Sequence, residues 1–287
     1  MLKKQEYIIT TDKFIDNKTI AVVSDFHINK EMNNKKIYKV LDTLHDIKPT
    51  HIVIPGDLYN VDRLTIREVP NNKVSLFIKD TTDIADVYYV KGNIEEKSDL
   101  LPYHLYNNKN RKFHLLCEEN CDFLNKKINK VEVVKENDIN IAGIRLPKDF
   151  YDRDDFAKKK ILLSRYKKYL ESISNQCEKD KFNVLLCHDP IIKDVLDILD
   201  TNFDLVISGH NHGGMFPRIL KGPLKVLGVD TAKAYPTYTK GIYSCGEGSM
   251  VVSKGITRFH PEMGAVKNLE KIHNGTIETI KVYSKKQ

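Results

Sequence analysis

Five short apolar runs in this chain each end in residues that can bind a metal ion. The runs span residues 19–23, 51–54, 86–90, 182–186 and 203–207. Their length and composition are typical of β-strands. In α/β proteins, binding sites form in the crevice beyond the carboxyl ends of the strands. The pattern therefore predicts an α/β fold in which these five strand ends meet at one site.

The residues at the five strand ends have similar chemistry. They are Asp25, His27, Asp57, Asn93, His188, His210 and His212. Taken singly, Asp57 or Asn93 could serve a turn, and His188 could be an ordinary hydrogen-bonded core histidine. Such roles do not explain why these residue types recur at one strand end after another. We interpret the seven residues as parts of one polar site.

Two pairs in this set are separated by a single residue. They are Asp25 with His27, and His210 with His212. On an extended chain, residues i and i+2 point to the same side, so the two members of each pair can face one side. Gly209 precedes the second pair and lets the backbone turn sharply there.

The set combines imidazole, carboxylate and amide groups. It lacks thiolate, which argues against a structural zinc knuckle, and it suits Mn, Fe, Zn, Ni or Co in open five- or six-coordinate sites. Seven ligands exceed the needs of one ion that must also bind solvent. Two ions about 3.5–4 Å apart that share a bridging carboxylate fit better.

The rest of the chain predicts helices and further strands around these runs. Helices are expected at residues 37–47, 74–77, 149–180 and 191–199. Strands are expected at residues 7–9 and 139–144, and loops with minor strands at residues 94–136. Asn274-Gly275 is a hairpin signal, which predicts that residues 276–283 form paired structure at a sheet edge. No linker or repeat is evident, so we expect one domain over residues 1–287.

Composition limits the classes of protein that fit. The 287 residues carry a net charge of +7, mostly from scattered Lys, which indicates a solvated surface more than a nucleic-acid-binding stripe. The five cysteines are too few and too irregular for a disulfide framework. There is no signal-peptide core, and no stretch approaches the ~18 apolar residues of a membrane span. We therefore expect a soluble cytoplasmic protein, and the oligomeric state is left open.

The order of the strand-end residues resembles that of the calcineurin-like metallophosphoesterase superfamily, from Ser24 to about Pro261. Residues 209–214 and 252–255 look most like its small bacterial metal-dependent phosphodiesterase branch. The resemblance implies two facing mixed β-sheets flanked by helices, which is an αββα sandwich. It also implies two divalent or trivalent metal ions, of which manganese is the one expected to work in vitro.

The same resemblance implies a role for each strand-end residue. The first ion would be held by Asp25, His27 and His212, and the second by Asn93, His188 and His210. Asp57 would bridge the two ions. A hydroxide between the ions would attack the phosphorus of a phosphate ester.

One position departs from the family pattern in an informative way. After Gly-Asn the family usually has a His that is thought to bind phosphate or to protonate the leaving oxygen, and this chain has Ile94 there. Proton transfer is typically worth 10²–10⁴-fold, so we expect a preference for phosphodiesters or activated phosphates over alkyl monoesters. His104 is a conceivable substitute, which leaves the catalytic acid unassigned. A milder departure is Met215, where the branch often has Gln.

Two other functions remain open. A metal-binding scaffold that acts through protein contacts would account for the missing His, although all seven ligands are kept. A metal-dependent nuclease would fit the basic charge, although no nucleic-acid motif supports it. The partner that we expect is a small phosphate-ester substrate.

Overall fold

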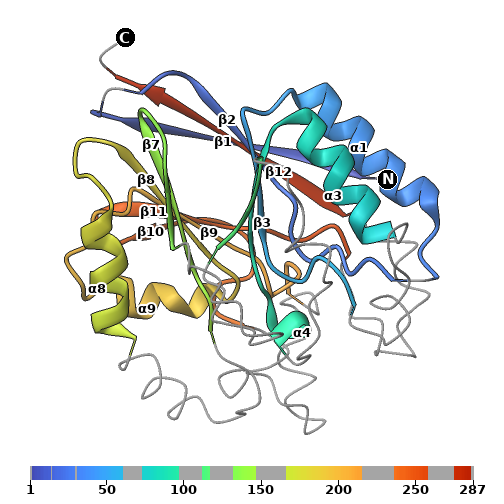
Figure 1. The fold of residues 1–287 in the computed structure, drawn as a ribbon. Coiled ribbons are helices and arrows are strands. Elements are labelled where there is room, and N and C mark those ends of the chain that lie inside the picture. The colour runs from blue at the N-terminus through green and yellow to red at the C-terminus, as the bar shows by residue number, and fades with distance from the viewer. Residues whose placement is uncertain are drawn as a thin grey trace, which may run out of the picture.

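The structure is a computed structural model, and it describes residues 2–13, 15–29, 31–60, 73–96, 112–116, 132–146, 166–214, 236–257 and 275–285. These residues form two mixed β-sheets of six strands each, which face one another (Figure 1). Helices cover the outer sides: α1 (Asn34–Ile47) and α3 (Lys73–Ile84) on one, α8 (Lys167–Gln176) and α9 (Lys193–Leu196) on the other (Figure 1). The predicted αββα sandwich is confirmed.

Each sheet has a parallel centre. The first sheet runs in the order β1 (Lys3–Thr11), β12 (Thr276–Ser284), β2 (Lys18–Val22), β3 (His51–Pro55), β4 (Asp86–Val90) and β5 (Phe113–Leu115). The second runs β10 (Gly241–Cys245), β11 (Gly248–Val252), β9 (Leu205–Ser208), β8 (Phe182–Cys187), β7 (Ile139–Ile144) and β6 (Val133–Lys135). Strands β2, β3 and β4 are parallel, as are β8 and β9, so their carboxyl ends lie at one edge of each sheet.

Three apolar layers hold the sandwich together. One lies between α1, α3 and the first sheet, one between the two sheets, and one between the second sheet and α8 and α9. Strand β4 shows why its sequence is a continuous apolar run. Val87 and Tyr89 belong to the helix-facing layer, whereas Tyr88 and Val90 belong to the layer between the sheets. A strand that is buried on both faces needs apolar residues at every position.

Most predicted elements are confirmed with small shifts. The bounds of β4 and β7 are as predicted, and β2, β3, β8 and β9 differ by at most two residues at either end. Helix α3 is longer than predicted, with 12 residues. A single helical turn, α4 (Asn93–Glu96), was not predicted. His104 and Met215 lie outside the described residues.

One predicted helix is shorter in the structure, and another, predicted as one long or broken helix, lies only partly within the described residues. The prediction for residues 191–199 is replaced by a 3₁₀ turn (Pro190–Ile192) followed by α9. The side chain of Asp189 accepts a hydrogen bond from the Ile191 N–H (3.0 Å), and Pro190 occupies the first turn, so the helix starts earlier than its apolar pattern. Helix α8 covers only the later part of residues 149–180, and residues 147–165 lie outside the described part of the chain.

The paired structure predicted at residues 276–283 is confirmed as β12, but its predicted place at a sheet edge was wrong. Strand β12 lies inside the first sheet, parallel to β1 and antiparallel to β2. It fills apolar layers on both of its faces, with Ile277 on the helix side and Ile280 between the sheets, as is typical of a strand in the interior of a sandwich. The edge is β1, whose residues Lys3 to Glu6 are exposed and polar, as suits an edge strand.

Candidate metal centre

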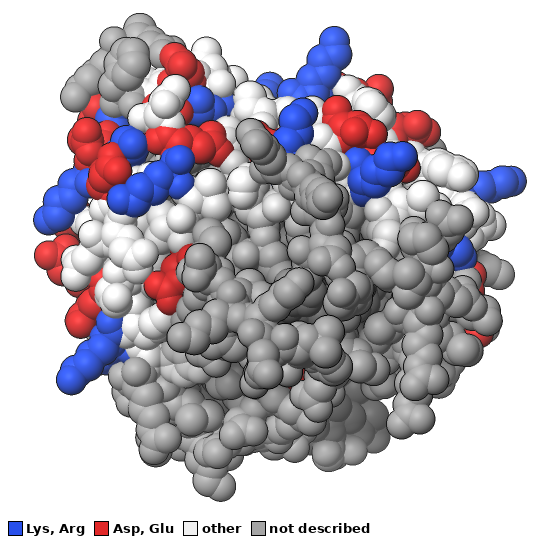
Figure 2. All heavy atoms as spheres, viewed as in Figure 1, with Lys and Arg blue, Asp and Glu red and all other residues white. Residues whose placement is uncertain are grey.

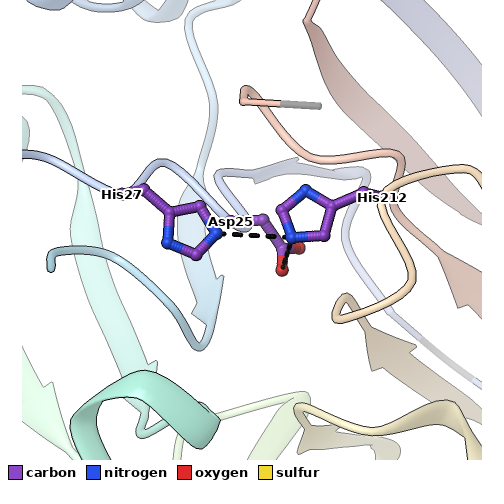
Figure 3. A group of neighbouring side chains, drawn as sticks. All are labelled: Asp25, His27 and His212. Atoms are coloured by element: carbon purple, nitrogen blue, oxygen red, sulfur yellow. Dashed lines mark hydrogen bonds and ion pairs between the residues drawn. The ribbon is translucent and has the colours of Figure 1, made fainter. Parts of the chain in front are cut away.

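Loops at the carboxyl ends of the parallel strands bring the predicted residues together in two groups. The first group is Asp25, His27 and His212 (Figure 3). The Nε2 atoms of His27 and His212 are 3.3 Å apart, and their rings are stacked. Asp25 Oδ1 lies 3.5 Å from His212 Nε2. The structure therefore joins the ends of β2 and β9, strands of different sheets, at one point.

The second group joins Asn93, His188 and His210. The Asn93 Oδ1 atom lies 3.0 Å from His188 Nε2 and 2.9 Å from His210 Nδ1. The two imidazole nitrogens, His188 Nε2 and His210 Nδ1, are 3.3 Å apart. Neighbouring histidines of the His210-Asn211-His212 motif thus belong to different groups, which is the division that the family resemblance implies.

Asp57 lies between the two groups. Its Oδ2 atom is 3.4 Å from His188 Nε2 and 3.9 Å from His27 Nε2. Ligand atoms of Asp25, Asp57 and His188 also lie within 4.8 Å of one another. All seven predicted residues therefore meet in one centre.

The backbone at this centre is not extended, so the extended-chain basis of the i, i+2 prediction was wrong. Five of the seven residues have positive φ, namely Asp25 (50°), His27 (52°), Asp57 (50°), His210 (71°) and His212 (46°). Among the described non-glycine residues, Lys48 at the end of α1 is the remaining one. A non-glycine residue in this region costs roughly 1–3 kcal/mol, and such residues cluster at functional sites.

Hydrogen bonds hold these strained loops in place. The Asp25 N–H donates to Gly56 O (3.2 Å) and the His27 N–H donates to Asp57 O (3.0 Å). The His210 N–H donates to both carboxylate oxygens of Asp25 at 3.1 Å. The loops after β2, β3 and β9 therefore fix one another.

Two glycines are needed because other site atoms occupy the space of a side chain. A Cβ at Gly209 would lie 1.9 Å from Ser24 Oγ and 2.4 Å from Asp25 Oδ2. A Cβ at Gly92 would lie 2.2 Å from Asp57 Oδ1. The glycines in front of the strand-end residues thus let neighbouring loops approach within contact distance.

Hydrogen bonds determine which imidazole nitrogen of three histidines carries the proton. The Nδ1 atoms of His27, His188 and His212 contact Asn60 Oδ1 (3.0 Å), Pro55 O (2.7 Å) and Thr257 O (2.5 Å). These oxygens can only accept, so each Nδ1 donates, and in the neutral ring each Nε2 presents a lone pair. Such oxygen partners typically orient metal-binding histidines.

The centre therefore brings acceptors face to face. His27 Nε2 faces His212 Nε2, and His188 Nε2 faces the amide oxygen of Asn93. Two lone pairs at about 3 Å cannot form a hydrogen bond, and leaving buried acceptors unsatisfied is costly. A cation between them removes the conflict, so the imidazole, carboxylate and amide donors of this centre fit transition-metal ions.

Without a cation, a proton on His188 is the alternative way to satisfy the contacts of its Nε2 atom. Burial favours the neutral form of His188, but the carboxylate of Asp57 outweighs it and raises the pKa of His188 to about 10. Burial likewise disfavours an ionised Asp57, yet His188 and His27 hold the pKa of Asp57 well below its usual range. A proton on His188 and a metal ion would compete for the same lone pair.

Sequence reasoning missed the residues that support the centre. Both carboxylate oxygens of the buried Glu95 accept backbone N–H groups, from Asp57 (3.0 Å), Leu58 (2.7 Å), Tyr59 (3.3 Å) and Gly92 (2.9 Å). Burial and Asp57 raise the pKa of Glu95 to about 8, and backbone donors oppose this. Glu95 therefore ties the loop after β3 to the loop after β4. The one signal in the sequence was its place two residues after Asn93.

Comparison with known proteins agrees with this geometry. The family model described as calcineurin-like phosphoesterase matches residues 18–214. The chain belongs to this family. The matched segment includes all seven residues of the centre, and the resemblance found in the sequence is confirmed.

The chain spans about half or less of the length of two relatives that it matches. A Caenorhabditis elegans protein named as a metallophosphoesterase is 27% identical over 206 residues, 70% of this chain and 38% of that protein. A Campylobacter jejuni protein named as a metallophosphoesterase is 26% identical over 254 residues, 85% of this chain and 55% of that protein. Among solved structures, a dimetal phosphatase from Danio rerio aligns with a TM-score of 0.48 and 12% identity, covering 85% of this chain and 90% of that one.

Proposed function

We propose that this protein hydrolyses phosphate esters with two metal ions held by the seven residues of the centre. Asp25, His27 and His212 would hold one ion, and Asn93, His188 and His210 the other. Asp57 would contact both. The observation that carries the proposal is the facing of buried acceptors, because a cation is the simplest partner for all of them at once.

The residues of the chain would fix the geometry before substrate arrives. Two bound ions would polarise the phosphate and lower the pKa of bound water. The Asp57 carboxylate is oriented by the Ile94 N–H, which donates to Oδ1 at 2.9 Å and leaves Oδ2 toward the histidines. Ligands that are held in this way need little reorganisation during the reaction.

The preference for diesters or activated phosphates is part of the proposal. Ile94 follows Asn93 in α4 and is partly exposed, and its aliphatic side chain can neither donate nor accept a proton. A substrate with a good leaving group does not depend on that proton. A poor leaving group, such as the alkoxide of serine phosphate, depends on it strongly.

Hydrolysis of bis(p-nitrophenyl) phosphate and of serine phosphate, compared with added manganese, tests both parts. We expect turnover of the diester to exceed that of serine phosphate by about 10²-fold or more. Equal rates would contradict the preference. A manganese-loaded protein that hydrolyses neither substrate would favour the scaffold function instead.

The nuclease alternative has less support from the surface. On the face seen in Figure 2, described Lys and Arg side chains are interspersed with Asp and Glu. A duplex-binding surface would gather its cations in one stripe. Metal-dependent DNA cleavage with steeply salt-sensitive binding would favour this alternative over the hydrolysis of small esters.

None of the described helices has the length and apolar character that a membrane span requires.

A further inference from the structure

The loop of residues 253–257, directly after β11, is held in place by the buried carboxylate of Glu278. Glu278 of β12 accepts hydrogen bonds from Ser253 Oγ (2.5 Å) and from the Lys254 N–H (3.0 Å). The Gly255 N–H donates to Ser253 Oγ (2.9 Å). Glu278 is 1% exposed, so these bonds are shielded from water. The backbone of Lys254 is therefore held in one position.

The same loop is bonded to the metal centre. The Ile256 N–H donates to Ser24 O (2.9 Å), and the Thr257 N–H donates to Asp25 O (3.0 Å). Gly255 has a φ of +77°, and a Cβ there would lie 2.8 Å from Asp25 Cβ. The carbonyl of Thr257 accepts the Nδ1 proton of His212. Lys254 is thus placed beside the first group of ligands.

The side chain of Lys254 runs along the loop that carries His212. A Cβ on Gly213, the residue after His212, would lie 3.2 Å from Lys254 Cγ and 3.8 Å from its Cδ. The lysine stem therefore occupies the space that a side chain at position 213 would need. Lys254 is partly buried, and its ammonium has no hydrogen bond or ion pair within the residues that the structure describes.

Two other cations near the centre differ from Lys254 in this respect. Arg145, just beyond β7, forms an ion pair with the buried Glu96 of α4. Lys36 donates to Thr257 Oγ1 (2.7 Å). Both cations already have a hydrogen-bond or ion-pair partner in the fold, whereas among the described residues the Lys254 ammonium acts on Glu278 only through its charge, without a direct bond.

We propose that the ammonium of Lys254 binds an anionic oxygen of the substrate phosphate on the His212 side of the centre. This inference rests on the proposed function and names a substrate-binding residue for it. The two carboxylates of the ligand set balance only half the charge of two divalent ions, and Lys254 adds to the positive excess. The site therefore selects the phosphate by its negative charge, and Lys254 gives that charge a defined position.

Inorganic phosphate binding to the manganese-loaded protein, measured by calorimetry, tests the role of Lys254 without turnover. Lys254→Met keeps the stem over Gly213 and removes the charge. We expect it to raise the Kd for phosphate about tenfold, which is the loss of one charge-assisted hydrogen bond. Lys254→Arg should stay within about threefold of wild type. The logarithm of the affinity should also depend less steeply on salt in Lys254→Met, because one charged contact is gone.

The control is Lys285→Met, which removes the same charge from an exposed residue paired with Asp12. It should leave the phosphate Kd unchanged. Equal phosphate affinity in wild type and Lys254→Met overturns the inference. So does loss of bound manganese in Lys254→Met, because Lys254 would then support the metal centre and not the phosphate. A wild type that binds phosphate but hydrolyses no ester counts against the proposed function alone.

Discussion

The two ends of the sandwich carry the same kinds of side chain and use them differently. At the carboxyl ends of the parallel strands, imidazole nitrogens, an amide oxygen and carboxylates face one another as acceptors. At the opposite end, His51 begins β3 and Glu136 follows β6, and each acceptor there meets a donor. Histidine and carboxylate are common to both ends, so residue type alone does not distinguish a ligand from a structural group.

The opposite end is a hydrogen-bonded network between the two sheets. His51 Nε2 lies 3.1 Å from Glu136 Oε2, and the Tyr88 hydroxyl donates to Glu136 Oε1. His51 Nδ1 in turn lies 2.8 Å from the Thr50 hydroxyl. None of these four residues has a positive φ. The network therefore joins β3 and β4 to the second sheet without strain, and it offers no cluster of lone pairs to a metal ion.

Of the changes that test this contrast between the two ends, we expect the largest effect on hydrolysis. Asp57→Asn keeps the size of the side chain and an acceptor for the Ile94 N–H, but it removes the charge between the two ligand groups. We expect metal-dependent turnover of bis(p-nitrophenyl) phosphate to fall about 10³-fold. Glu136→Gln removes the same charge at the other end and should leave turnover unchanged. Asp57→Asn activity within tenfold of wild type would show that the charge of Asp57 is not needed.

Manganese should stabilise the protein by binding at the metal centre and not at the end that holds His51 and Glu136. At about 100 times its Kd, a ligand that binds the folded state alone adds about 2.7 kcal/mol to the free energy of unfolding. We expect a matching rise in Tm that EDTA reverses. The rise should be smaller in Asp57→Asn and fully kept in His51→Gln. Loss of the manganese effect in His51→Gln would mean that the ions bind at the end that holds His51 and Glu136.

Much of the fold and of the metal centre could be predicted from the sequence. Apolar runs that fill both faces of a strand mark the parallel centre of each sheet, and parallel neighbours end at the same edge. Asp25, Asp57 and His188 follow such runs within three residues, so their convergence needed no knowledge of the loops. The prediction relied on topology, which short sequence patterns specify well when strands are buried.

The features that could not be predicted from the sequence depend on contacts between distant segments. Left-handed backbone at Asp25 and His210 is stabilised by hydrogen bonds between loops 185 residues apart in sequence. Glu95 and Glu278 carry no local pattern, since their partners lie on other loops. The position of β12 between β1 and β2 joins the two ends of the chain. Local turn chemistry at Asn274-Gly275 could not predict such a pairing.

A change at position 94 should widen the range of substrates that the metal centre hydrolyses. Ile94→His restores a group that can carry a proton next to Asn93, without disturbing the Ile94 N–H bond to Asp57. We expect hydrolysis of serine phosphate to rise about tenfold or more, with little change for bis(p-nitrophenyl) phosphate. Ile94→Leu is the matched control and should show no gain. An equal rate for Ile94→His and wild type on serine phosphate would show that another group supplies the proton.

The smallest effect that we expect is on how the free energy of unfolding depends on pH, through Glu136 at the end opposite the metal centre. Burial works to raise the pKa of Glu136, but hydrogen bonds from His51 and Tyr88 outweigh it and lower this pKa from its usual value of 4.5. The ionised carboxylate therefore adds stability that is fully present above that value and is lost as the pH falls through the lowered pKa. Urea unfolding at pH 7 should show Glu136→Gln to be about 1–2 kcal/mol less stable than wild type. The difference should shrink as the pH falls from about 5 to about 3, whereas a constant difference would assign the loss to packing of the Gln side chain and not to charge.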